Sequence, residues 1–156
     1  MAGPYRQQGK DYSALLDALF PPELNNAKDV AWKSLPAGTD AKRPYVVDLL
    51  KALGGQECVA YARTWVHCDQ DLTARLELGS DDGVKVWLND KQVYAHNIAR
   101  ALTPGSDKVD VNLHSGWNRL LLKVTQKNQG WEFCARLRKP DGSPVEGLRC
   151  EAAPSS

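Results

Sequence analysis

The stretch that decides the fold is Gly79-Ser80-Asp81-Asp82-Gly83-Val84-Lys85-Val86-Trp87-Leu88-Asn89-Asp90-Lys91. It joins an acidic turn to a strand with alternating apolar residues and then to a second turn at Asn89-Asp90. Such a run is typical of the rim of a β-sandwich. Asp81 and Asp82 repel each other unless water, a cation or hydrogen-bond donors compensate their charges. The pair therefore indicates either a calcium site or a turn capped by a carboxylate.

The period of two continues on both sides of this stretch. From Cys58 onward, segments bounded by Gly, Asp, Asn and Pro predict antiparallel strands near residues 58–67, 71–79, 83–89, 91–95, 107–113, 118–126, 131–138 and 144–150. One alternating face is apolar and is predicted to be core: Leu76, Leu78, Val84, Val86, Leu88, Leu120, Leu122 and Val124. The other face carries Arg75, Glu77, Lys85, Arg119 and Lys123. Short strands with tight turns predict an all-β fold, an antiparallel β-sandwich of the jelly-roll kind.

Two segments before Cys58 have helical spacing. Residues 11–20 place Tyr12, Leu15, Leu16 and Leu19 on one face before Pro21-Pro22, which predicts a short helix. Residues 45–53 end at Gly54-Gly55 and indicate either a short helix or a buried strand and turn. We expect one domain over residues 1–150, in which 1–57 form a helical and irregular N-terminal wrap and 58–150 hold the main strands. Residues 151–156 have the composition of a linker remnant.

The charge balance excludes several classes of function. The 156 residues include 20 basic and 19 acidic side chains, with a formal net charge of +1 and no long run of either sign. A nucleic-acid or membrane-surface binder would show a basic footprint, so neither partner is expected. No apolar run approaches the roughly 20 residues that span a bilayer, and no signal peptide precedes Gly3. The sequence as written therefore predicts a soluble chain, and we expect it to be a monomer.

The four cysteines have long spacings and form no paired CxxC pattern for zinc. If Cys58 and Cys68 lie on one extended strand, ten steps of about 3.3 Å separate them by roughly 33 Å, too far for a disulfide. A hairpin centred on Gly142 would place Cys134 opposite Cys150. That pair is either a disulfide or two buried thiols, and the spacing leaves both open.

Several segments together resemble one set of bacterial domains that accompany secreted polysaccharide-degrading enzymes. The matching segments are Gly-Pro-Tyr at 3–5, Pro-Pro-Glu at 21–23, Val-Ala-Tyr-Ala-Arg-Thr at 59–64, the stretch 79–89, and Gly-Trp-Asn-Arg-Leu-Leu-Leu-Lys-Val at 116–124. Those domains resemble the galactose-binding-domain-like β-sandwich superfamily, which includes many carbohydrate-binding modules. The resemblance implies a secreted, extracellular accessory module whose partners are a polysaccharide and the neighbouring domains of a parent enzyme.

The acidic corner has a second likeness. Ser-Asp-Asp before an aromatic-bearing strand is similar to the motif of lectin domains of the protective-antigen type, in which aspartates joined by a cis peptide hold Ca²⁺ and the ion holds sugar hydroxyls. The likeness implies Asp81 and Asp82 as metal ligands, with Asn89 or Asp90 to complete the site. The chain departs from its relatives at Asn89-Asp90, where they commonly carry Asn-Gly.

Sugar binding needs a flat apolar platform with polar groups at its edge. The predicted carbohydrate-binding residues are Trp87, Tyr94, Asn97, Arg100, Trp117, Asn128 and Trp131. Tyr94, Asn97 and Arg100 lie in a loop at the rim, where binding groups are common. The others have structural alternatives: the N-terminal segment can cover Trp87, sandwich turns often bury an aromatic such as Trp117, Trp131 alternates with Phe133 as core residues do, and amides such as Asn128 are ordinary in turns. Trp65 shares a face with Arg63 and His67, and it is open to either interpretation.

No motif for catalysis is present. His67, His96 and His114 lie outside any metalloprotease or triad context, and no nucleophile elbow or phosphate-binding loop occurs. The sequence therefore predicts a non-catalytic carbohydrate-binding module that targets an associated enzyme to a polysaccharide. The first alternative is a structural or protein-docking sandwich, in which Trp32, Trp65 and Trp87 anchor an interface. A second is a small lyase or hydrolase that uses an unrecognised set of carboxylates and histidines.

Overall fold

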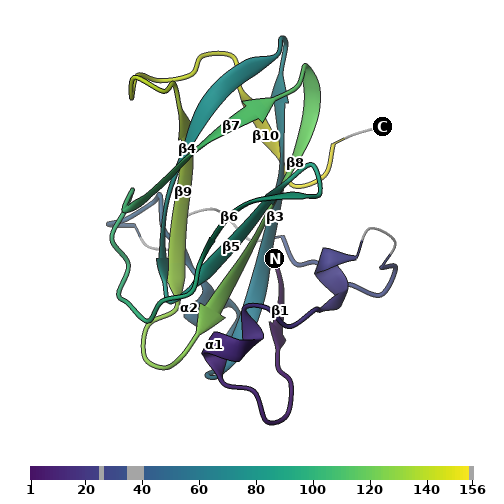
Figure 1. Ribbon diagram of the computed structural model, residues 1–156, viewed down its shortest axis with the longest axis vertical. Coiled ribbons are helices and arrows are strands. Elements are labelled where there is room, and N and C mark those ends of the chain that lie inside the picture. The colour runs from purple at the N-terminus through teal and green to yellow at the C-terminus, as the bar shows by residue number, and fades with distance from the viewer. Residues whose placement is uncertain (25–26, 35–40, 155–156) are drawn as a thin grey trace.

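A computed structural model of the chain describes residues 1–24, 27–34 and 41–154. Two antiparallel β-sheets face each other, as Figure 1 shows. The six-stranded sheet has the order β1 (Ala2–Tyr5), β3 (Cys58–Cys68), β8 (Gly116–Gln126), β5 (Val84–Leu88) and β6 (Lys91–His96), and β10 (Arg149–Glu151) also pairs with β3. The four-stranded sheet has the order β2 (Val47–Asp48), β9 (Glu132–Arg138), β4 (Leu72–Asp81) and β7 (Asp107–Leu113). The predicted antiparallel β-sandwich is confirmed.

The two sheets bury one apolar layer between them. All eight alternating positions predicted to be core are buried: Leu76, Leu78, Val84, Val86, Leu88, Leu120, Leu122 and Val124. Trp131 and Phe133, beside and on β9, join the same layer. Burial of apolar area, at about 25 cal/mol per Å², is the main force that holds such a sandwich together.

The outer face of the six-stranded sheet is covered in part by the N-terminal segment. This segment contains α1 (Tyr12–Leu15) and a short 3-10 helix, η1 (Pro21–Glu23). A second apolar cluster forms there, made by Leu15, Ala18 and Phe20 from the segment and by Val59, Tyr61 and Leu121 from the sheet. Lys123 lies on this face, as predicted, but it is completely buried beneath the segment. We call this side of the six-stranded sheet the outer face.

The predicted helix over 11–20 is longer than the one that forms. Asp11 caps α1 by accepting the Ala14 N–H at 2.9 Å, but the helix ends at Leu15. Phe20 is extended, with φ −130° and ψ 161°, because a residue before proline avoids the helical region. Leu19, predicted on the apolar face, is therefore 65 % exposed. Between residues 45 and 53 both alternatives occur in succession, since β2 leads into α2 (Leu49–Leu53).

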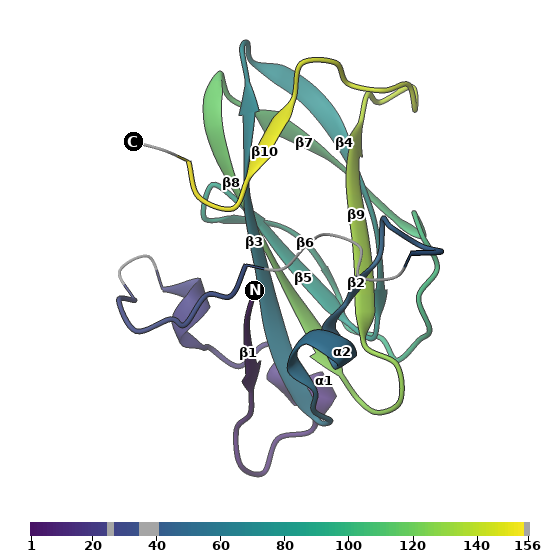
Figure 2. The ribbon, with the colours of Figure 1, turned by 180° about the vertical axis from the view of Figure 1, so that it is seen from behind.

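The predicted last strand, 144–150, is wrong in most of its length and in its partner. Only Pro144 makes an isolated bridge to Arg138, after which the chain crosses to the other sheet and β10 pairs with β3. Figure 2 shows β10 beside β3, well apart from β9. The pairing of β1 with β3 was not predicted either.

This crossing overturns the disulfide alternative. Cys134 lies in β9 and Cys150 in β10, which belong to different sheets, and all four cysteines are free thiols. Cys58 and Cys68 lie at opposite ends of β3, as the spacing predicted. No helix in the described ranges is long and apolar enough to cross a membrane.

Candidate functional site

The acidic corner, Asp81 and Asp82, lies at the turn between β4 and β5. Its two carboxylates have different surroundings. The Asp81-Asp82 peptide is cis. The Asp82 carboxylate is buried and accepts the backbone N–H of Arg100 at 3.0 Å and that of Lys127 at 2.7 Å. It therefore holds two loops to the strand ends, which is the capping role.

Asp81 has no such support. Within the described part of the chain its carboxylate accepts no hydrogen bond, and it lies close to Gly130 of the β8–β9 loop. Burial raises the pKa of Asp81 to about 7, helped by the negative charges of Asp82 and Glu132. The carboxyl thus changes its charge near neutral pH.

The predicted calcium ligands are not gathered at this corner. Both oxygens of Asp82 already accept N–H groups, and Asn89 lies at the far end of β5, where it bonds Asn118 and the Arg119 N–H. No group of three or more His, Cys, Asp or Glu side chains converges as a metal site among the residues that the structure describes. Ca²⁺ prefers six to eight oxygens, and the corner offers one free carboxylate. The structure does not bring the three predicted ligands together.

Three predicted sugar-binding residues contact the protein itself. Arg100 donates to the Ser80 carbonyl at 3.0 Å and to Asp107 Oδ1 at 3.1 Å. Tyr94 donates to the same Asp107 oxygen at 2.9 Å, and burial raises the pKa of Tyr94 to about 12. Asn97 donates its amide to the Ser13 carbonyl at 3.0 Å, which fastens α1 to the sheet. These side chains fix the rim and leave little free for a ligand.

The remaining predicted residues divide between core and surface. Trp131 is 1 % exposed and belongs to the core, the structural alternative given for it, so it offers almost no surface to a ligand. Trp87 is half-buried and packs against the cluster beneath the N-terminal segment. Trp117 is half-buried with its ring edge-on to His67 at 5.0 Å, and Asn128 is exposed in the β8–β9 loop.

A cavity of about 320 Å³ lies on the outer face, between the sheet and the N-terminal segment. We call it the outer-face cavity. Its lining combines two indoles with three charged side chains and a proline-rich wall: Trp32, Trp65, Arg63, Arg119, Asp90, Pro21, Pro22, Leu24, Ala27 and Val30. The floor of the cavity follows from the strand register, because Trp65 on β3 lies directly opposite Arg119 on β8. Alternation places Arg63 on the same face, two residues before Trp65.

Arg63 has an unusual environment in this cavity. Its guanidinium carbon lies 4.1 Å from the centre of the Trp32 ring, so the two planar groups form a cation–π contact. The Nε atom is buried and has no hydrogen-bond partner in the described residues. Burial lowers the pKa of Arg63, and the positive charge of Arg119 lowers it further.

Arg119, by contrast, is anchored. It forms an ion pair with Asp90 and donates to the Pro22 carbonyl at 3.3 Å. Asp90 lies in the β5–β6 turn, where Asn89 and Asp90 both have positive φ, 48° and 67°. These values suit a type I′ hairpin turn, so the Asn-Asp pair keeps the turn that Asn-Gly would make. The turn therefore carries a carboxylate to the edge of the cavity.

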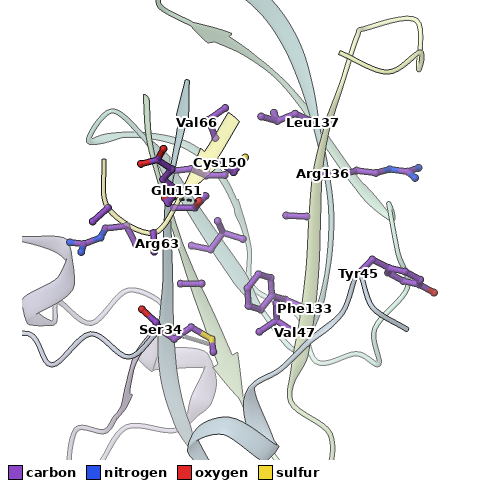
Figure 3. A pocket seen from close by; sticks show the side chains of 18 of the residues that line it. Ser34, Tyr45, Val47, Arg63, Val66, Phe133, Arg136, Leu137, Cys150 and Glu151 are labelled. Carbon is purple, nitrogen blue, oxygen red and sulfur yellow. Dashed lines mark hydrogen bonds between the residues drawn. The ribbon is translucent and has the colours of Figure 1, made fainter. Parts of the chain in front are cut away.

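A larger groove of about 750 Å³ opens between β3 and β9. Figure 3 shows Val66, Phe133 and Leu137 directed into it, whereas Arg63 and Arg136 extend away on opposite sides. Its walls are mainly aliphatic core residues such as Leu76, Leu120 and Leu122. Its lining also includes Arg136 and Glu151, and it shares Trp32 and Arg63 with the outer-face cavity.

The sequence pattern identified the residues of the outer-face cavity only in part. The alternation of Arg63, Trp65 and His67 opposite a core face was visible, but it left the direction of Trp65 open. The contribution of Trp32 depends on how the irregular segment crosses the sheet, and that segment has no periodic signal.

The fold and its cavity define a two-sheet antiparallel β-sandwich with a polar, aromatic cavity on one outer face. Comparisons of the chain with protein-family models, with curated proteins and with solved structures find no match. The function must therefore be inferred from the chain's own residues.

Proposed function

We propose that the chain is a non-catalytic carbohydrate-binding module of the galactose-binding-like, jelly-roll kind, and that its sugar site is the outer-face cavity. One observation carries the proposal: two indoles line the same cavity of about 320 Å³ as the Arg63 guanidinium, whose Nε has no hydrogen-bond partner among the described residues. A cavity of this size is at the small end of ligand sites. It suits a single sugar unit better than a folded partner.

The chemistry of the lining supports this ligand class. The face of a pyranose is apolar C–H surface, and Trp32 and Trp65 provide the aromatic surface that would contact it. The Arg63 guanidinium supplies N–H donors in the lining, and Asp90 supplies an acceptor at the edge of the cavity. Vicinal hydroxyls both donate and accept hydrogen bonds, so Arg63 as donor and Asp90 as acceptor could bind two neighbouring hydroxyls of a sugar. Arg119 holds Asp90 in place.

The biological role follows from tethering. A module that binds a polysaccharide raises the effective concentration of an attached enzyme on it, without chemistry of its own. We propose that the chain works in this way outside the cell, as an accessory part of a larger glycan-active protein. None of the four cysteines lines the outer-face cavity.

Affinity electrophoresis through gels that contain individual polysaccharides tests the proposal. At least one glycan should retard the wild-type protein, and Trp65→Ala or Trp32→Ala should weaken the retardation about tenfold or more, as loss of a stacking aromatic does. Tyr45→Ala is the matched control, since Tyr45 is an exposed aromatic residue that lies outside this cavity. Circular dichroism should show that each variant is folded.

If no glycan retards the protein, the sugar proposal fails and the docking sandwich becomes the better hypothesis. Pull-down with the neighbouring domains of the parent protein then tests that alternative. Loss of retardation in Tyr45→Ala as well as in the cavity variants would place the site elsewhere.

A further inference from the structure

The charges of the outer-face cavity point to a narrower ligand class. We propose that the bound sugar carries a carboxylate, so that the module recognises uronic-acid units of a polysaccharide. The inference depends on the proposed carbohydrate-binding function. It rests on the arrangement of Arg63, Arg119 and Asp90.

The lining holds one more positive charge than negative. Arg63 and Arg119 are cations and Asp90 is an anion, and the charges of Arg119 and Asp90 offset each other in an ion pair. Arg63 forms no salt bridge within the described ranges. Glu151 on β10 lies opposite Trp65 in the register. Within the described ranges, Glu151 forms no ion pair with Arg63 either. A single unpaired guanidinium therefore remains in the cavity.

The cost of this arrangement argues for an anionic ligand. Removing a cation from water is unfavourable unless an opposite charge or hydrogen-bond acceptors compensate it. Trp32 compensates only in part, because a cation–π contact is weaker than a hydrogen-bonded ion pair. Burial and the nearby Arg119 both disfavour the charged form of Arg63. A carboxylate bound here would relieve both effects.

Geometry favours a carboxylate over a hydroxyl. The Arg63 guanidinium lies against the Trp32 ring, 4.1 Å from its centre, and a planar fork of N–H donors matches the two oxygens of a carboxylate. A neutral hydroxyl would accept one of these bonds and leave the charge unpaired. In a uronic acid the carboxylate is attached to the sugar ring, so the indoles could contact the ring while Arg63 binds the acid.

The test uses polymers that differ only at the acid. Polygalacturonate, alginate and hyaluronan are each compared with their carboxyl-reduced forms, and dextran sulfate serves as a polyanion without carboxylates. At least one acid form should bind about tenfold or more tightly than its reduced form, as expected for a charge-assisted pair. Raising the salt concentration should narrow this difference, because the cavity is open to solvent.

Two variants assign the effect to Arg63. Arg63→Gln should abolish the preference for the acid form, and Arg63→Lys should keep part of it, since lysine keeps the charge and loses the fork. Arg136→Gln is the control, because Arg136 is exposed on the other sheet and pairs with Glu77. Thermal unfolding of each variant shows whether a loss reflects misfolding.

The outcomes separate the inference from the proposed function. Equal binding of acid and reduced forms, or an acid preference that survives Arg63→Gln, overturns the carboxylate assignment and leaves a neutral-sugar module standing. Binding of dextran sulfate as tight as that of the best uronate also overturns it, since that shows general attraction to polyanions. Absence of binding to any glycan overturns the proposed function itself.

Discussion

Lys123 and Glu23 lie 100 positions apart in the chain and form a buried ion pair, with Lys123 Nζ 2.9 Å from Glu23 Oε1. The lysine side chain is completely buried, and it also donates to the Ala18 carbonyl at 2.6 Å. Glu23 accepts a second hydrogen bond from the Tyr61 hydroxyl. The pair therefore fastens the N-terminal segment to the outer face of the sheet, and it holds one wall of the outer-face cavity in position.

Removing one partner of this pair should destabilise the fold severely. Glu23→Ala leaves a buried ammonium without its counter-ion, so we expect the free energy of unfolding to fall by about 3–5 kcal/mol. Lys123→Met together with Glu23→Gln should cost much less, because no charge is left buried. Urea denaturation measures both. A loss below about 1 kcal/mol for Glu23→Ala would show that water reaches Lys123 and that the segment is loosely attached.

The pKa of Asp81 predicts a pH dependence of stability opposite to that of a paired carboxylate. In the unfolded chain the pKa of Asp81 is near its ordinary value of 3.8, and in the folded chain it is about 7. Between these values the folded state holds a proton that the unfolded state has released, so this group lowers stability as pH rises from about 4 to about 7. Above about pH 7 the contribution of Asp81 to the free energy of unfolding no longer changes with pH.

Asp81→Asn should remove this effect. The variant should be more stable than the wild type at about pH 8 by about 1–2 kcal/mol, less than the full equivalent of the shift because solvent screens a partly exposed carboxyl. At about pH 4 the two proteins should have similar stability. Thermal unfolding across this pH range provides the measurement, and a constant difference at every pH would contradict the raised pKa.

The same corner predicts a negative result with calcium. Because Asp82 already caps two backbone N–H groups and Asn89 lies at the other end of β5, millimolar CaCl₂ should leave the unfolding midpoint where NaCl of equal ionic strength leaves it. A specifically bound ion would raise the midpoint by mass action. If calcium alone raises the unfolding midpoint, and Asp81→Asn removes that rise, then the corner does bind the ion.

The sequence predicted what depends on local periodicity. The alternation of Val84, Val86 and Leu88 identified the buried face of β5, because a strand presents alternate residues to one side. It also placed Lys123 correctly on the opposite face. Its burial was not predictable, since the cover comes from a segment about 100 residues earlier in the chain.

The candidate site was harder to predict for the same reason. Tyr94, Asn97 and Arg100 were predicted to bind sugar, yet their side chains form hydrogen bonds with the protein itself. The outer-face cavity joins Trp32 from an irregular segment to Trp65 from a strand, and no sequence pattern specifies that contact. Short strands such as β10 were missed or misassigned because their partner, β3, is distant in sequence.

The Asn89-Asp90 turn allows backbone and charge to be tested separately. Asp90 has φ 67°, which a residue with a Cβ adopts at a cost of about 1 kcal/mol and glycine adopts freely. The Asp90 side chain also forms the ion pair with Arg119, but it is 47 % exposed, so that pair should contribute about 0–1 kcal/mol.

Asp90→Asn removes the charge and keeps a residue that tolerates positive φ, so the free energy of unfolding should fall by no more than about 1 kcal/mol. Asp90→Gly removes the charge and relieves the backbone, and it should be about 1 kcal/mol more stable than Asp90→Asn. The glycine variant should therefore be as stable as the wild type or slightly more so, measured by urea denaturation. If Asp90→Gly is instead the less stable of the two variants, the turn does not have the left-handed geometry at Asp90, and the carboxylate would not lie at the edge of the cavity.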